Sequence, residues 1–234
     1  MKSVKVVRMV LAIFFFLSIC LISNAGFADE EKIKLNMKIN SARVVLEEME
    51  EMPDTSIPSD LLKSCHGIAI FPSVIKGAFG FGGMGGSGVL LSRDPDTGKW
   101  SPPVFVSIGG LSFGFQIGGQ ATDMVLVIMS ERGVMSLSHD NVTLGGDASV
   151  AAGPLGRNAE IATDAALNTG IYSYSRSKGL FIGISLKGAI VGPQKNLVKD
   201  YYGENMTAEK ILFSKKVQPS ETGQKLINLL DKYD

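Results

Sequence analysis

The position of the glycines constrains the fold more than any other feature of this sequence. The chain has 27 glycines in 234 residues, and most of them lie between Gly67 and Gly192. Within this stretch they alternate with phenylalanine, isoleucine, valine and leucine, which is the period of a strand. The pattern Phe79-Gly80-Phe81-Gly82 returns as Phe113-Gly114-Phe115-Gln116. A strand face without side chains lets a sheet bend sharply, or lets another backbone or a ligand approach closely. Of these two interpretations, we favour curvature in a barrel-like sheet.

The strands are expected to be short and separated by turns. Asp94-Pro95-Asp96-Thr97-Gly98 is a strong turn signal. The expected strands are Gly67–Phe71, Gly77–Gly83, Gly88–Ser92, Val104–Ile108, Ser112–Gly118, Met124–Met129, Val142–Ala152, Ala166–Arg176 and Leu180–Lys187.

Helical patterns flank the expected sheet at both ends. Asn40 or Ser41 can cap a first helix that runs to about Met52, and Pro53 ends it. Ser130 can cap a short helix inside the sheet region. The expected later helices are Asn196–Tyr202, Ala208–Ser214 with Thr207 as its cap, and Glu221–Lys232. The sequence therefore predicts an α+β fold: a glycine-rich, strongly curved, mostly antiparallel sheet with N-terminal and C-terminal helices.

The first residues have the pattern of a secretory signal peptide. Basic residues precede an apolar run, Met9–Ile22, which is short for a membrane span. Small residues at Gly26 and Ala28 permit cleavage before Asp29, and an uncleaved membrane anchor is the alternative. We expect a periplasmic or secreted protein. The expected divisions are a signal peptide at 1–28, a helical segment at 29–56, the main domain at 57–202 and a helical extension at 203–234.

Charge and cysteine content exclude several classes of function. Removal of residues 1–28 takes three basic and no acidic residues from totals of 23 each, which leaves a net charge of −3. Bulk charge therefore gives no attraction to nucleic acid. One cysteine, Cys65, remains, so neither an internal disulfide nor a multi-cysteine zinc site is possible. We expect no metal and no cofactor.

Two motifs resemble enzyme signatures but lack the required context. Gly80–Gly85 fits G-x-G-x-x-G, yet no helix follows it to hold a pyrophosphate. Gly110–Gly114 fits the G-x-S-x-G nucleophile elbow around Ser112, and Asp123 and His139 follow in the order of a hydrolase triad. The elbow needs a helix directly after the serine, whereas strand alternation follows here. We expect no catalytic residue, and keep a serine hydrolase using Ser112 as a third alternative.

Basic and aromatic residues gather late in the sheet region. Tyr172, Tyr174 and Arg176 share one face of an expected strand, and Lys178 lies in the turn beyond it. Arg157 follows a turn whose amides could bind an anion. Tyrosine beside arginine and lysine is typical of surfaces at the level of lipid headgroups. These five residues are the candidate headgroup site; a solvated sheet face with a tyrosine pair is the alternative.

Two stretches carry a resemblance to a known family, Leu144–Arg157 and Tyr172–Phe181. Together with Gly67–Pro72, Lys76–Gly83 and Gly98–Pro103 they resemble the SYLF domain family. The resemblance implies a non-enzymatic, lipid-binding module, with an anionic phospholipid or membrane surface as partner. A protein-interaction or structural module of the cell envelope, with an envelope protein as partner, is the second alternative.

Overall fold

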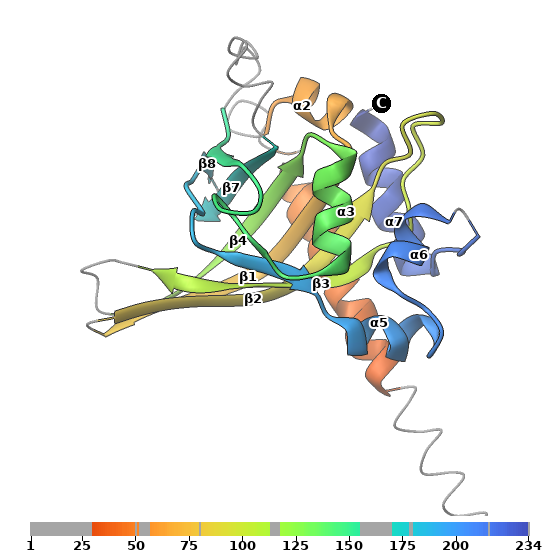
Figure 1. Cartoon of the computed structure of the whole chain (residues 1–234), viewed down its shortest axis with the longest axis horizontal. Helices are drawn as coiled ribbons and strands as arrows, with labels where there is room; N and C mark the ends of the chain where they lie inside the picture. The colour runs from red at the N-terminus through yellow and green to blue at the C-terminus, as the bar shows by residue number, and fades with distance from the viewer. Residues whose placement is uncertain are drawn as a thin grey trace, which may run out of the picture.

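The structure is a computed structural model, and it describes residues 30–49, 51, 57–79, 81–112, 118–154, 170–177, 180–214 and 216–233. One nine-stranded sheet forms its centre (Figure 1). The long strands are β1 (Gly67–Phe79), β2 (Phe81–Ser92), β3 (Val104–Ser112), β4 (Gly118–Ile128) and β7 (Ile171–Ser177). The short strands are β5 (Val142–Thr143), β6 (Val150–Ala152), β8 (Leu180–Gly183) and β9 (Ile190–Pro193).

The strand order is β5-β9-β3-β2-β1-β4-β7-β6, with β8 also paired to β7. Each pairing is antiparallel except that of β6 with β7. The sheet curls strongly, and its register with both neighbours of β1 shifts between residues 70 and 75. Inside this bend a Cβ on Gly88 would lie 2.0 Å from the carbonyl oxygen of Ile70, so only glycine fits there. The expected α+β class with a curved, mostly antiparallel sheet is confirmed.

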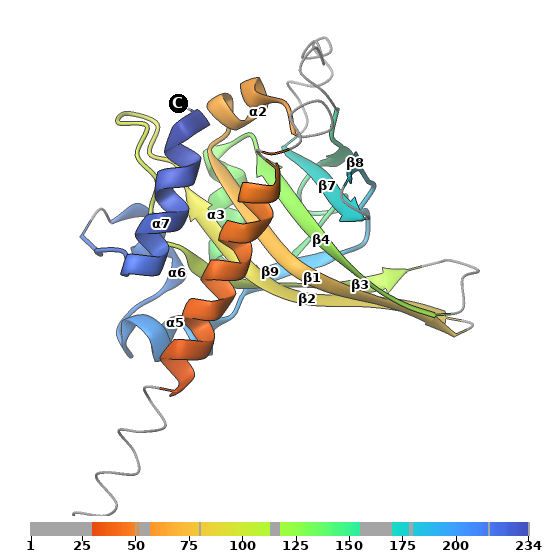
Figure 2. The same ribbon diagram turned by 180° about the vertical axis from the view of Figure 1, so that it is seen from behind.

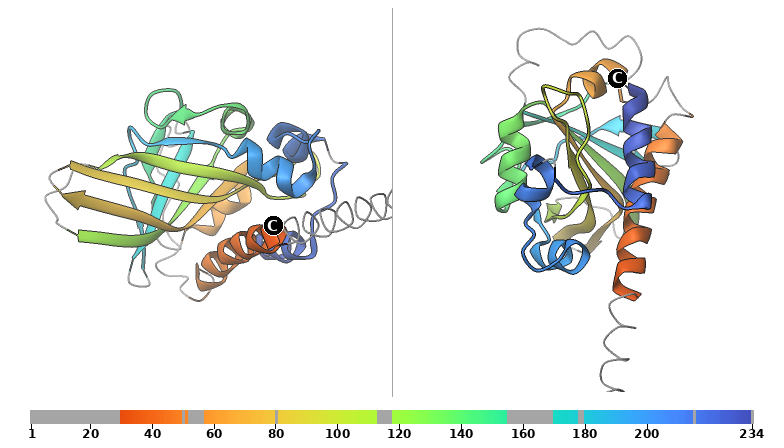
Figure 3. Two further views of the ribbon diagram at one scale, coloured as in Figure 1. Left: turned by 90° about the horizontal axis from the view of Figure 1, so that it is seen from below. Right: turned by 90° about the vertical axis from the view of Figure 1, so that its right-hand side faces the viewer.

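Helices cover both faces of the sheet (Figure 3). The N-terminal helix, residues 30–49, crosses one face diagonally over β1 and β4 (Figure 2). Next to it lies α7 (Glu221–Leu230), and α3 (Glu131–His139) covers the opposite face. The remaining helices are α2 (Ser59–Ser64), α5 (Lys195–Tyr202), α6 (Ala208–Phe213) and the 3-10 turn η2 (Asp231–Tyr233).

A single hydrophobic cluster unites the sheet with the helices at both ends of the chain. It includes Leu46 of the N-terminal helix, Phe105 of β3 and Leu226 of α7. The Tyr201 hydroxyl, from α5, contacts Asn36 Oδ1 at 2.5 Å and Ser220 Oγ at 2.7 Å. The terminal helices are therefore part of the same core as the sheet. Nothing in the structure tests the four expected divisions of the chain, which stay predictions.

Several expected elements differ from the observed ones. The first helix begins by residue 30, and Ser41 lies inside it, where its hydroxyl donates to the Met37 carbonyl at 3.0 Å instead of capping. The expected strand Gly77–Gly83 is the end of the β1–β2 hairpin, because glycine alternation continues across the turn. Val142–Ala152 divides into β5 and β6, and β9 was not expected. The caps Ser130 and Thr207 are confirmed, since each accepts a backbone N–H in the first turn of its helix.

Candidate functional site

Four strands continue beyond the rest of the sheet and form a projection, which we call the blade (Figure 1). The last β3–β9 pair is Gly109 with Ile190, and the last β4–β7 pair is Asp123 with Arg176. Past these points β1–β4 continue in the order β3-β2-β1-β4. The blade consists of the described residues 74–79, 81–86, 109–112 and 118–122. Its two inner strands are paired on both sides, so their peptide groups are hydrogen-bonded.

One face of the blade is apolar and open to solvent. The register places Ile75 beside Gly85 and Ala121, and places Leu111 and Gly77 on either side of Gly83. Paired residues share a face, and so do residues two apart, so these positions form one surface, which we call the open face. Ile75 is 63% exposed and Leu111 is 77% exposed. A Cβ built on Gly77, Gly85 or Gly119 would meet no atom within 4 Å.

Charge is almost absent from the strands that build the blade. Residues 67–92 and 104–122 include a single charged residue, Lys76. Lys76 alternates with Ile75 and Gly77 and therefore points away from the open face. It is half-buried, and burial lowers the pKa of its ammonium group. An exposed apolar surface without charges is a candidate for contact with a protein or a membrane.

A groove separates the blade from the N-terminal helix. Its volume is about 480 Å³, and Pro72, Ser73 and Ser87 line it from the sheet. Met37 and Lys38 line it from the helix. Met37 is exposed, and burial lowers the pKa of Lys38. Because Ser87 lies two residues along β2 from Gly85, the groove adjoins the open face of the blade, and Glu31, Lys34 and Lys38 line it with charge.

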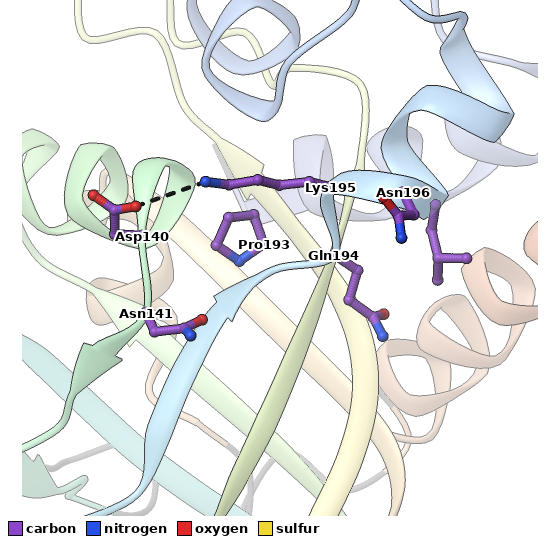
Figure 4. A pocket seen from close by; sticks show the side chains of 7 residues that line it. Asp140, Asn141, Pro193, Gln194, Lys195 and Asn196 are labelled. Atoms are coloured by element: carbon purple, nitrogen blue, oxygen red, sulfur yellow. Dashed lines mark ion pairs between the residues drawn. The ribbon is translucent and has the colours of Figure 1, made fainter.

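A second hollow, of about 590 Å³, lies between the end of α3 and the start of α5 (Figure 4). Asp140, Asn141, Gln194 and Lys195 line it, and Lys195 Nζ lies 3.7 Å from Asp140 Oδ1. A neighbouring hollow shares Lys195. The mixture of charges and amides suits a polar partner and gives no preference for one sign of charge.

The candidate headgroup residues occupy different environments. Tyr172 and Tyr174 are buried, so the alternative of a solvated sheet face does not describe this tyrosine pair. Burial, with Tyr172 as a second cause, raises the pKa of Tyr174 far above its usual value. A Cβ on Gly153 would lie 2.0 Å from the Tyr174 ring, so the ring packs directly against the Gly153 backbone. Among the described residues the Tyr174 hydroxyl has no hydrogen-bond partner.

Arg176 joins three elements. Its Nε and Nη2 donate to Asp123 Oδ2 at 2.9 and 2.6 Å, and its Nη1 pairs with Glu48 of the N-terminal helix. Asp123 Oδ1 also accepts the backbone N–H of Ser73 at 2.9 Å. Ser73 has a positive φ of 54° and lies in the bulge where the blade begins. Arg176 is thus a cation already held by two carboxylates, at the junction of blade, sheet and helix.

Arg157 and Lys178 lie outside the described residues. The structure thus brings Tyr172, Tyr174 and Arg176 together on β7, where Arg176 pairs with Glu48 of the N-terminal helix, and leaves the other two candidates untested. Whether the five residues bind a headgroup stays a prediction.

The expected hydrolase residues have other partners. Ser112 ends β3 in strand conformation, opposite Gly82. Asp123 binds Arg176 and Ser73, as described above. His139 ends α3, and its Nε2 lies 3.4 Å from Glu209. In the described part of the chain no three metal-ligating side chains cluster, and no helix has the length and apolar character needed to cross a membrane.

The fold and its surfaces define a class: a one-core α+β domain whose most distinctive surface is an uncharged, projecting sheet. Comparison with known proteins identifies the family. The profile of the Ysc84 family, described as "Las17-binding protein actin regulator", matches residues 109–233. The chain belongs to this family, the SYLF domain family, as the sequence motifs predicted.

Similar proteins are eukaryotic and longer. The chain is 36% identical over 205 residues to SH3 domain-containing YSC84-like protein 1 of Bos taurus, covering 85% of this chain and 59% of that protein. It is 39% identical over 183 residues to the Xenopus laevis protein of the same name, covering 77% and 54%. LAS seventeen-binding protein 3 of Saccharomyces cerevisiae is 38% identical over 181 residues, covering 76% of this chain and 39% of that protein. The chain thus spans little more than half the length of its animal relatives.

Sequence reasoning did not identify the blade as a site. A signal for it was present, because two long glycine-rich stretches have one charge between them. The alternation of glycine with apolar residues does not show which face of the sheet is covered. The exposure of Ile75 and Leu111 is therefore visible only in the tertiary structure.

Proposed function

We propose that this protein is a non-enzymatic, membrane-surface-binding module, and that the open face of the blade makes the contact. The observation that carries the proposal is the exposure of Ile75 and Leu111 on an otherwise uncharged face. Burying an exposed aliphatic side chain contributes about 1.5–3 kcal/mol when burial is complete. Membership of a family described by binding and regulation agrees with a non-catalytic role.

Replacement of the two exposed aliphatic residues tests the contact. The double variant Ile75→Thr, Leu111→Thr removes apolar surface at both positions. Threonine favours strands, so the variant should keep the fold of the blade. We expect vesicle affinity to fall about four- to tenfold for each substitution, or about 15- to 100-fold for both, if half of each side chain enters the lipid. Vesicle flotation of the purified domain measures this.

A matched control uses β8, a short strand outside the blade that also exposes two aliphatic side chains. Leu180 and Ile182 of β8 are 51% and 48% exposed and lie next to the predicted headgroup residues. Leu180→Thr, Ile182→Thr should keep wild-type affinity. If this variant loses vesicle binding and the blade variant does not, the membrane contact lies at the signature stretch Tyr172–Phe181 instead of the blade.

We also propose that the protein acts in the cell envelope, after removal of a leader near Ala28. The basic residues before Met9–Ile22 and the small residues at Gly26 and Ala28 support this proposal. N-terminal sequencing of the protein from cells should find a start near Gly26 or Asp29. A start at Met1 in a membrane-embedded protein would contradict it.

A protein-interaction module is the second candidate function. The name of the yeast relative describes a protein that binds LAS seventeen, and the polar hollow beside Lys195 offers this chain a surface for a protein partner. Capture of one defined envelope protein, lost in Lys195→Ala and kept in the blade variant, would favour this candidate. Esterase activity that depends on Ser112 would instead support the hydrolase alternative.

A further inference from the structure

We propose that the blade recognises loosely packed lipid by apolar insertion and does not require anionic headgroups. This inference rests on the proposed function and specifies its partner: a bilayer whose surface exposes hydrocarbon, whatever its charge. It reverses the expectation drawn from Arg157, Arg176 and Lys178, which required an anionic lipid.

The charges of the molecule favour this reversal. The blade's one lysine points away from the open face and is half-buried. The 234 residues have a formal net charge of zero, and removal of residues 1–28 leaves −3, so net charge gives no long-range attraction to an anionic bilayer. One lysine close to an anionic surface contributes about 1 kcal/mol, which corresponds to about a fivefold change in affinity. Electrostatics can therefore modulate binding by the blade but cannot drive it.

Arg176 adds nothing to such an attraction. Its guanidinium lies between Glu48 and Asp123, so this local group of three charges is not cationic. In the groove beside the blade, Glu31, Lys34 and Lys38 are the charged lining residues, and Glu30 pairs with Lys34 at 2.8 Å, so two carboxylates accompany the two lysines.

The backbone of the two inner strands of the blade is suited to contact with hydrocarbon, whereas within the described ranges β3 past Gly109 and β4 before Asp123 are paired on one side only. A peptide group that enters lipid must keep a hydrogen bond, because water is absent there. The inner strands β1 and β2 meet this condition, since each is paired on both sides. Glycines 77, 83 and 85 add no side chain above these paired peptides, so the sheet itself can approach the lipid.

The small number of exposed apolar side chains explains why the blade would prefer loosely packed lipid. Ile75 and Leu111 are the large exposed aliphatic residues of the blade itself, and Ile190 of β9, which pairs with Gly109 at the border of the blade, is 46% exposed. The burial of so few side chains in lipid releases too little free energy to separate tightly packed headgroups. Where membrane curvature or unsaturated lipid chains already expose hydrocarbon, Ile75 and Leu111 enter the lipid without first separating headgroups. Binding strength of this kind depends on curvature and lipid composition.

Vesicles of defined charge and packing test the inference. We would compare neutral phosphatidylcholine vesicles with vesicles containing one-third phosphatidylglycerol, each as small sonicated and large extruded preparations, at low and tenfold higher salt. We expect affinity to change by less than about fivefold with lipid charge or salt. We expect tighter binding to small, unsaturated vesicles under every salt condition. The variant Lys76→Met should bind as the wild type does.

The possible failures are distinguishable. Binding that needs phosphatidylglycerol and falls about 100-fold with salt would overturn this inference and leave membrane binding itself in place. No binding to any vesicle would overturn the proposed function as well. A dimer in analytical ultracentrifugation that Ile75→Thr, Leu111→Thr converts to monomer would assign the open face to a second copy and overturn both.

Discussion

Glycine has opposite roles on the open face of the blade and in the rest of the same sheet, which we call the base. In β2, a Cβ on Gly85 would meet nothing within 4 Å, whereas a Cβ on Gly88 would lie 2.0 Å from a backbone oxygen. In the base, glycine is required for close packing: Gly183 approaches the Gly153 backbone, and Gly153 approaches Tyr174. On the open face of the blade, Gly77, Gly85 and Gly119 leave the surface open. Abundant glycine therefore does not distinguish a packing requirement from a binding surface, but space around each position does.

The largest expected effect comes from adding one methyl group to the base. Gly88→Ala would force the Ile70 backbone to move, and we expect a loss of about 3 kcal/mol or more in the free energy of unfolding. Gly85→Ala should stabilise by about 0.5 kcal/mol, because alanine restricts the unfolded chain and meets no neighbour. Urea denaturation of both variants measures the difference. Equal effects at the two sites would remove the distinction between blade and base.

Arg176 tests the junction between the two regions. Arg176→Ala would leave Glu48 and Asp123 close together without their cation, and we expect a loss of about 3 kcal/mol in the free energy of unfolding. The exposed Arg132 on α3 provides the control, since Arg132→Ala should change stability by less than about 0.5 kcal/mol. Calorimetry or urea denaturation reports the effect. If Arg176→Ala stays stable but loses vesicle binding, the headgroup role predicted from the sequence is correct.

Ser73 gives the smallest effect and the sharpest test of the bend. Its positive φ is unfavourable for serine, while its N–H bond to Asp123 does not need the side chain. Ser73→Gly should therefore stabilise by about 0.5–1 kcal/mol, and Ser73→Val should destabilise. Thermal unfolding compares them. A destabilised Ser73→Gly protein would mean that the serine hydroxyl, and not only the backbone conformation, maintains the angle of the blade.

Local patterns in the sequence predicted the class of fold well. Strand alternation, the turn at Asp94–Gly98 and the caps Ser130 and Thr207 depend on neighbours a few residues away, and the structure contains each of them. The limits of β1 and β2 were not predictable in the same way. Glycine and phenylalanine alternate through the hairpin end, so the pattern has no signal for the reversal between Phe79 and Phe81.

The sequence by itself determined the family, the α+β class and the near absence of charge from the long strands. It also placed Tyr172, Tyr174 and Arg176 on one face of a strand. Only the tertiary structure decided that this face is covered, because the N-terminal helix that supplies Glu48 is distant in the sequence. The same packing leaves Ile75 and Leu111 uncovered. Alternation shows which residues share a face, whereas burial depends on what packs against that face, and that is decided by contacts between distant segments.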